Sequence, residues 1–202
     1  MANNLPKIIL ASGSAGRKMM LDNAYVPFTA TPAYINERAI IDDGLDSGQN
    51  IKDITVQLAN QKALHVAAKN SSSIVIGSDQ TLEFEGAILS KAEDDDEAKE
   101  KLKALRGKTH YLHSAVSVAR DDDVLFTHIE SAELTMHDFS DAFLDSYMAR
   151  DPDALVSCVG GYKIEGAGAW LFSSIKGDNF TIMGMPLLPL LGFLHDEFGF
   201  QP

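Results

Sequence analysis

Three side chains near the amino terminus have the chemistry needed to bind phosphate: the hydroxyls of Ser12 and Ser14 and the guanidinium of Arg17. They lie between an apolar run at residues 8–11, which predicts a buried strand, and a helical pattern over residues 17–23. A strand that leads through a Ser/Gly loop into a helix points backbone N–H groups at one spot, where the helix dipole favours an anion. An ordinary strand-to-helix turn with a serine cap is the alternative. The spacing matches neither GxGxxG nor GxxxxGK[ST], so neither nucleotide-binding motif is assigned.

Two carboxylates stand where they could activate water or hold a metal. Asp79 follows the apolar run 74–76 and is expected just past a buried strand, where α/β proteins place functional side chains. It could take a proton from water or coordinate a metal, and a turn aspartate that accepts nearby N–H groups is the alternative. Glu37 lies in a predicted long loop over residues 32–50, where a glutamate is otherwise simply solvated.

Basic residues are few, 17 Lys and Arg against 29 Asp and Glu, so the position of each one is informative. Lys62 lies on a predicted helix over residues 51–69, and Lys91 follows a predicted hairpin. The segment Arg-Gly-Lys-Thr-His at residues 106–110 ends another predicted helix. It suits a glycine C-cap with cations in the last turn as well as it suits a phosphate contact.

Acidic triplets at residues 94–96 and 121–123 resemble metal sites by composition alone. Their positions favour a helix N-terminus and a hairpin turn instead. Cys158 has no catalytic context and is interpreted as a small buried hydrophobe.

Strand and helix signals alternate along the chain, which favours an α/β fold with a mixed sheet. Predicted strands cover residues 8–11, 27–31, 74–76, 111–119, 124–134 and 169–175. Predicted helices cover residues 17–23, 51–69 and 92–105, a short segment after Ser140 and a last segment after Pro186.

The net charge of −12 restricts the partners. A chain this acidic repels a nucleic-acid backbone, so a phosphate ligand must be small and held by a local cationic pocket. The single cysteine excludes an internal disulfide, and no apolar run approaches 18 residues. We therefore expect a cytoplasmic protein that binds no nucleic-acid polymer and no membrane.

These residues occur together, and in this order, in one known family. The chain resembles the Maf-like nucleoside triphosphate pyrophosphatases over residues 7–192. The matching positions are Ser12, Ser14 and Arg17, then Glu37, Lys62, Asp79, Lys91, the segment 106–110, Gly177-Asp178 and the segment 184–187.

The resemblance implies hydrolysis of a nucleoside triphosphate between its α and β phosphates, giving the monophosphate and pyrophosphate with the help of Mg²⁺ or Mn²⁺. It implies Asp79 as catalytic acid/base, Glu37 and Asp79 as metal ligands, and a substrate contacted by Ser12, Ser14, Arg17, Lys62 and Lys91. It also implies one ITPase/Maf-like domain over residues 1–202, in which a mixed twisted sheet flanked by helices forms two lobes around a central cleft. A homodimer and a cytoplasmic, house-cleaning role in nucleotide metabolism follow from the same resemblance.

Three further positions bear on which base is bound. Gln80 and Glu165 resemble the residues at these positions in the family branch that prefers 7-methyl-GTP rather than those in the dTTP/UTP branch. Gly16 stands where members of both branches usually have a large residue. A carboxylate pairs with a guanine edge and suits the positive charge of a methylated ring.

Two other functions are compatible with the same residues. A nucleotide-binding regulator of cell division would sense triphosphates without turning them over. A sugar-phosphate or nucleotidyl transferase would reuse the phosphate loop.

Overall fold

The computed structural model describes residues 6–202, which divide into two compact units. The first unit comprises the described residues up to Gln80, then Ser114–Glu130 and Gly184–Pro202. The second unit comprises Thr81–His113 and Ser131–Met183. The expectation of a single domain with a central cleft stays a prediction.

The strands pair in the order β2-β1-β3-β5-β6-β7, and β4 pairs with β3. They are β1 (Ile8–Leu10), β2 (Phe28–Ala30), β3 (Ile74–Phe84), β4 (Ala87–Leu89), β5 (Thr109–Arg120), β6 (Asp123–Met136) and β7 (Phe172–Lys176). Strand β1 is parallel to both β2 and β3, whereas the pairs β3–β4 and β6–β7 are antiparallel. The predicted α/β class with a mixed sheet is therefore confirmed.

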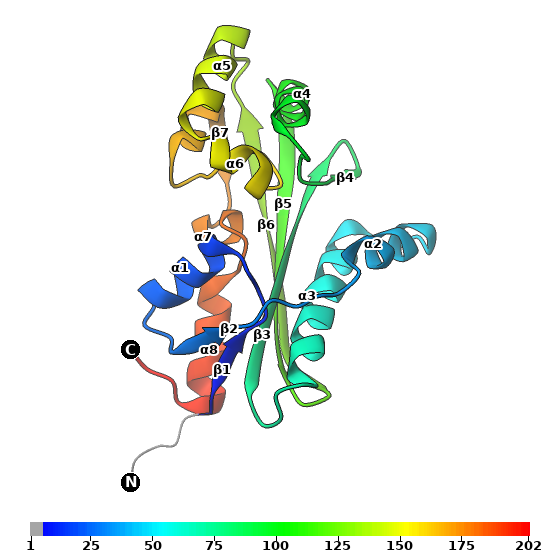
Figure 1. Cartoon of the computed structure of the whole chain (residues 1–202), viewed down its shortest axis with the longest axis vertical. Helices are drawn as coiled ribbons and strands as arrows, with labels where there is room; N and C mark the ends of the chain where they lie inside the picture. The colour runs from blue at the N-terminus through cyan, green and yellow to red at the C-terminus, as the bar shows by residue number, and fades with distance from the viewer. Residues whose placement is uncertain (1–5) are drawn as a thin grey trace. The chain divides into compact units, whose positions relative to one another are not determined.

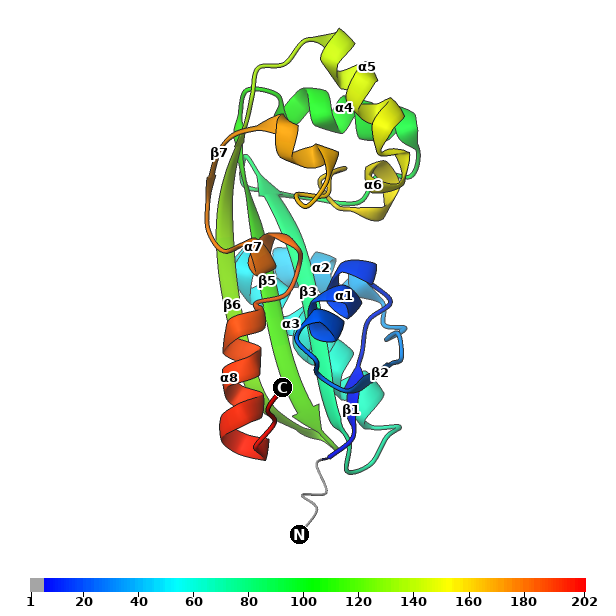
Figure 2. The same cartoon turned by 90° about the vertical axis from the view of Figure 1, so that its left-hand side faces the viewer.

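The first unit has helices on both faces of its strands, as Figures 1 and 2 show. Its helices are α1 (Ala15–Asn23), α2 (Glu37–Asp46), α3 (Ile51–Ala67) and α8 (Leu187–Phe198). Helix α3 covers one face, and α1 and α8 cover the other (Figure 1). Because side chains alternate along a strand, Ile9 and Val75 join Ala63 of α3 in one buried cluster.

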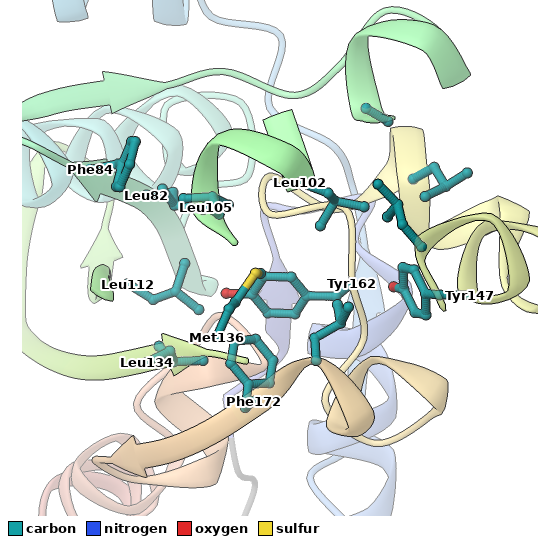
Figure 3. Packing of buried hydrophobic residues seen from close by; sticks show 14 of the residues in the cluster. Leu82, Phe84, Leu102, Leu105, Leu112, Leu134, Met136, Tyr147, Tyr162 and Phe172 are labelled. Carbon is teal, nitrogen blue, oxygen red and sulfur yellow. The ribbon is translucent and has the colours of Figure 1, made fainter. Parts of the chain in front are cut away.

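The second unit is built around a larger hydrophobic cluster (Figure 3). Its helices are α4 (Asp95–Leu105), α5 (Asp141–Arg150), α6 (Pro152–Ser157), the 3₁₀ helix η1 (Ala167–Leu171) and α7 (Asn179–Ile182). Leu102 of α4 and Phe172 of β7 lie in the cluster beside Tyr162, whose ring meets that of Phe172 edge-on at 4.8 Å. The Tyr162 hydroxyl also bonds the buried His110 Nε2 at 2.6 Å, which ties the segment before η1 to β5.

Two predictions of secondary structure, the loop over residues 32–50 and the start of the strand at residue 169, are wrong. Residues 32–50 are not a continuous loop, because α2 occupies much of the segment behind an Asn36 cap that accepts from the Ala39 N–H. Gly44, taken as a loop residue, is instead where α2 packs against Ile54 of α3. Similarly, the strand expected at residues 169–175 begins only at Phe172, after η1.

Asp79 also lies differently from its predicted place just past a strand. Strand β3 continues to Phe84, so Asp79 is inside it. The second half of β3 persists because it pairs with β4 and buries Leu82 in the hydrophobic cluster. The parallel partner β1 nevertheless ends at Leu10, opposite Ile76, so Asp79 lies just beyond the carboxyl end of that pair.

Within residues 6–202, no helix combines the length and the apolar content needed to span a membrane.

Candidate active site

In the first unit, the Lys62 side chain contacts two carboxylates. Its Nζ lies 2.9 Å from Glu37 Oε1 and donates a short hydrogen bond to Asp79 Oδ1. The side chains of Lys62 and Asp79 are each 9% exposed, whereas that of Glu37 is 49% exposed. One buried ammonium group therefore holds together two carboxylates that come from α2 and β3.

A glycine explains how Lys62 comes so close to Asp79. Gly77 lies two residues before Asp79 on the face of β3 that α3 covers. A Cβ placed at Gly77 would be 2.3 Å from the Ala59 carbonyl oxygen and 2.6 Å from the Ala63 amide nitrogen. Because both are backbone atoms of α3, only glycine lets the helix approach the strand to this distance.

The loop after β1 folds around Arg17. Ser14 caps α1 by accepting the Arg17 backbone N–H at 3.4 Å, and Ser12 Oγ accepts from the Ser14 N–H at 3.2 Å. Arg17 Nη1 donates to the same Ser12 oxygen at 3.2 Å. The serine-capped turn is therefore confirmed. A hydroxyl that accepts still carries its own proton as a donor, and a phosphate contact by this loop stays a prediction.

Gly184 fixes the other side of the Arg17 guanidinium. Its carbonyl oxygen accepts from Arg17 Nε at 2.9 Å and from the Ser78 hydroxyl at 3.0 Å. The Gly184 backbone has a φ of +104°, which side-chain-bearing residues rarely adopt. The segment 184–187 thus has a role that sequence reasoning did not assign, which is to orient Arg17.

Gln80 lies on the same side of β3 as Ser78, which donates to the Gly184 carbonyl oxygen. A Cβ placed at Gly184 would be 3.6 Å from Arg17 Nη2 and 3.7 Å from Gln80 Oε1. The Gln80 amide nitrogen donates to Ser114 Oγ at 3.0 Å. Gly16 is in the first turn of α1, directly before Arg17. Two of the three predicted specificity positions therefore lie close to Arg17.

Burial and neighbouring charges act in opposite directions on this group. Burial raises the pKa of the Asp79 carboxyl above its ordinary value, and the positive charges of Lys62 and Arg17 oppose the rise. Burial lowers the pKa of Arg17, while Asp79 and Glu37 favour its charged form. The four residues form one electrostatic system, in which two positive and two negative groups face one another.

Lys91 and Glu165 belong to the second unit. Lys91 is exposed in the segment between β4 and α4, and Glu165 is exposed in the turn before η1. Glu165 is three residues after Tyr162, whose contacts with His110 and Phe172 anchor that segment. That Lys91 and Glu165 act together with the Lys62 group stays a prediction.

The segment 106–110 has structural partners of its own in the second unit. Arg106 ends α4, pairs with Asp141 at 2.5 Å and lies over the Phe139 ring. Lys108 pairs with Glu85 at 3.0 Å. The interpretation of this segment as a helix end is confirmed.

The acidic triplets also have the structural roles expected of them. Asp94 caps α4 by accepting the Glu97 N–H, and Asp121 is in the turn between β5 and β6. Across residues 6–202, no three His, Cys, Asp or Glu side chains gather into a group that could hold a metal.

Glu37 and Asp79 fit a divalent cation as a pair. Both carboxylates lie within ion-pair distance of the same Nζ, so their oxygens converge on one positive charge. Mg²⁺ prefers oxygen ligands, keeps several of its waters, and is commonly bound through one or two carboxylates. Two carboxylates are therefore a sufficient contribution from the protein.

A family model and curated relatives match nearly the whole chain. The family model described as "Maf-like protein" matches residues 7–197. A protein from Brucella abortus named 7-methyl-GTP pyrophosphatase is 43% identical over 191 residues, which cover 95% of this chain and 96% of the relative. A protein from Nitrobacter winogradskyi named nucleoside triphosphate pyrophosphatase is also 43% identical, over 94% of this chain and 93% of the relative. Among solved structures, a HAM1 protein from Coxiella burnetii aligns with a TM-score of 0.42 at 15% identity, covering 67% of this chain and 75% of that chain.

Proposed function

The chain belongs to the Maf-like protein family, and we propose that it hydrolyses a nucleoside triphosphate to the monophosphate and pyrophosphate with the help of a divalent cation. The names of the relatives support the reaction class. The observation that carries the proposal is the meeting of Glu37, Lys62 and Asp79, with Arg17 in the same electrostatic group.

Asp79 is proposed as the group that activates water. The water oxygen attacks a phosphorus of the anhydride, the bond from that phosphorus to the bridging oxygen breaks, and the bridging oxygen leaves with the electron pair. The proton of the water passes to the Asp79 carboxylate. Its buried position and raised pKa suit this role, because a base works best when its pKa approaches the working pH.

Positive charge is needed at the leaving group, where the bridging oxygen keeps the electron pair of the broken bond. Arg17 is held by the Gly184 carbonyl and Ser12, so its guanidinium is oriented before substrate arrives. Preorganised donors of this kind stabilise developing charge without reorganising during the reaction. Ser14, Lys62 and Lys91 are proposed as further phosphate contacts. Glu37 and Asp79 would hold the divalent cation, which supplies Lewis-acid stabilisation of the phosphate oxygens.

A 7-methylguanine base is proposed as the preferred one. The proposal rests on Gln80 beside Arg17 and on an exposed carboxylate at Glu165. A carboxylate can accept hydrogen bonds from a guanine edge and favours the positive charge that N7-methylation introduces.

A panel of triphosphates tests the proposed reaction. The full chain is incubated with 7-methyl-GTP, GTP, UTP, dTTP and ATP, each with and without Mg²⁺ or Mn²⁺, in water enriched in ¹⁸O. The expected products are the monophosphate and pyrophosphate, formed only with metal, and the ¹⁸O identifies the phosphorus that is attacked. Binding without turnover would favour a regulator instead, and transfer to an added sugar phosphate would favour a transferase. Release of orthophosphate from the γ position would contradict the proposed bond.

A further inference from the structure

Lys62 contacts both carboxylates that are proposed to hold the divalent cation. Its Nζ is 2.9 Å from Glu37 Oε1 and is bonded to Asp79 Oδ1. In this arrangement the ammonium group holds the two carboxylates together, which is what the cation would do.

We propose that Lys62 is an internal counter-ion that exchanges partners: its ammonium neutralises Glu37 and Asp79 in the free protein and moves to the substrate's phosphates when a divalent cation takes over the carboxylates. This inference rests on the proposed function. It adds that metal and triphosphate bind cooperatively, and that Lys62 causes the cooperativity.

The charge balance of the site supports the exchange. Lys62 is in ion-pair contact with Glu37 and Asp79, and the formal charges of Arg17, Lys62, Glu37 and Asp79 sum to zero. A divalent cation added to this neutral group meets two positive side chains, which opposes its binding. A triphosphate brings the negative charge that both cationic side chains then need.

Burial keeps Lys62 at the carboxylates until something replaces it. Its side chain is 9% exposed, as is that of Asp79. A buried carboxylate without a cationic partner is strongly unfavourable, so the pair is not expected to open for water alone. A divalent cation is a substitute of the right charge.

The two cationic side chains differ in their freedom to move. Arg17 is fixed by bonds from Nε to the Gly184 carbonyl and from Nη1 to Ser12 Oγ. Lys62 is anchored at its Cα by α3, while its flexible four-carbon stem lets the ammonium move. Arg17 is therefore the stationary phosphate ligand and Lys62 the mobile one.

Mn²⁺ binding in the absence of nucleotide tests the exchange. The free Mn²⁺ signal in electron paramagnetic resonance gives the dissociation constant for the wild type and for Lys62→Met, with both carboxylates present. We expect Lys62→Met to bind Mn²⁺ at least about tenfold more tightly, because a positive charge in contact with the ligands is gone. Lys62→Arg, which keeps the charge, should bind as weakly as the wild type. Lys52→Met, an exposed lysine on the same helix, is the matched control and should leave Mn²⁺ binding unchanged.

The direction of the change separates partner exchange from a purely structural role. If Lys62 merely supported the fold, its loss would loosen the carboxylates and weaken Mn²⁺ binding. Equal or weaker binding by a folded Lys62→Met protein overturns the inference, and so does the absence of Mn²⁺ binding by both proteins. If Lys62→Met does not fold, Lys62→Gln carries the same expectation, because its amide can still donate to Asp79.

The melting temperature, measured with and without Mn²⁺, gives a second test of the exchange. Without metal, the melting temperature of Lys62→Met should lie below that of the wild type, and saturating Mn²⁺ should raise it more than it raises the wild type. An equal Mn²⁺ response in the two proteins contradicts the inference. Neither measurement involves turnover, so failure of the triphosphate panel and failure of the exchange are distinguishable.

Discussion

The contact between Gly77 and α3 gives a prediction whose size follows from the structure. In Gly77→Ala, the new methyl would lie 2.3 Å from the Ala59 carbonyl oxygen and 2.6 Å from the Ala63 amide nitrogen. Ordinary contacts of a carbon are near 3.5 Å, so α3 and β3 must separate by about 1 Å. Overpacking of this kind costs roughly 1–3 kcal/mol, which in a chain of this length lowers the melting temperature by roughly 2–12 °C.

The same displacement should act on the proposed site. Lys62 is on α3 and its partner Asp79 is on β3, so separating the two elements loosens their ion pair. Misplacement by about 1 Å can cost about 10²-fold in rate. Turnover of triphosphate is measured well below both melting temperatures, so that a loss of rate reports the displaced side chains rather than unfolding.

Gly192→Ala is the matched control. A Cβ at Gly192 on α8 would have no neighbour within 4 Å. Replacing a helical glycine by alanine stabilises by roughly 0.5–1 kcal/mol, so this variant should melt higher and keep full activity. If Gly77→Ala has the melting temperature and the turnover rate of the wild type, the close packing of α3 on β3 does not require glycine at position 77. The explanation of the Lys62–Asp79 contact is then wrong.

Three further outcomes follow from the second unit and from the carboxylates. Burial lowers the pKa of His110 to about 4 from 6.5; the unfolded chain therefore binds the proton more readily, and stability falls as pH drops from about 6.5 to about 4. By this linkage the wild type should lose about 2.5 kcal/mol more than His110→Gln between pH 7 and pH 4.5 in urea unfolding, and equal losses would contradict it. Glu37→Gln should change stability by less than about 1 kcal/mol, because the Glu37 side chain is half exposed and Lys62 keeps Asp79 as a partner. It should also raise the Mg²⁺ concentration for half-maximal turnover; an unchanged Mg²⁺ titration would remove Glu37 from the metal. Glu165→Gln should shift preference away from 7-methyl-GTP in competition assays, and an unchanged substrate ranking would exclude its role.

Local sequence signals predicted the elements that bear most of the site. The serine cap before α1, the helix that carries Lys62 and the strand that reaches Asp79 follow from periodicity and capping over a few residues. Such features depend on neighbours in the chain, which a sequence displays directly.

The features that were missed depend on distant contacts. Gly44 appeared to be a loop residue because its packing partner Ile54 is on another helix. Gly77 follows the predicted strand 74–76 and was given no packing role, although alanines at positions 59 and 63, on one face of the facing helix, were a usable signal of close approach. The support of Arg17 by Gly184 joins positions 167 residues apart, and no local pattern reveals such a bond.

The acidic composition and the cationic side chains of the site are compatible. The chain carries a net charge of −12, yet Arg17 and Lys62 face the two carboxylates from buried or half-buried positions. Partly buried charges are screened less by salt than surface charges are. We therefore expect the two cationic side chains to be available to a small phosphate compound once a cation takes over the carboxylates, and we expect the acidic composition to disfavour a nucleic-acid backbone.

Substitution of Asp79 tests the central claim most directly. Asp79→Asn keeps the size of the side chain and an oxygen acceptor for Lys62 but cannot take a proton from water. In single-turnover reactions with saturating Mg²⁺, we expect the variant to keep its circular dichroism spectrum and to release monophosphate and pyrophosphate on the order of 10²-fold or more slowly than the wild type. Release at the wild-type rate by the folded variant would contradict the claim that Asp79 activates the water.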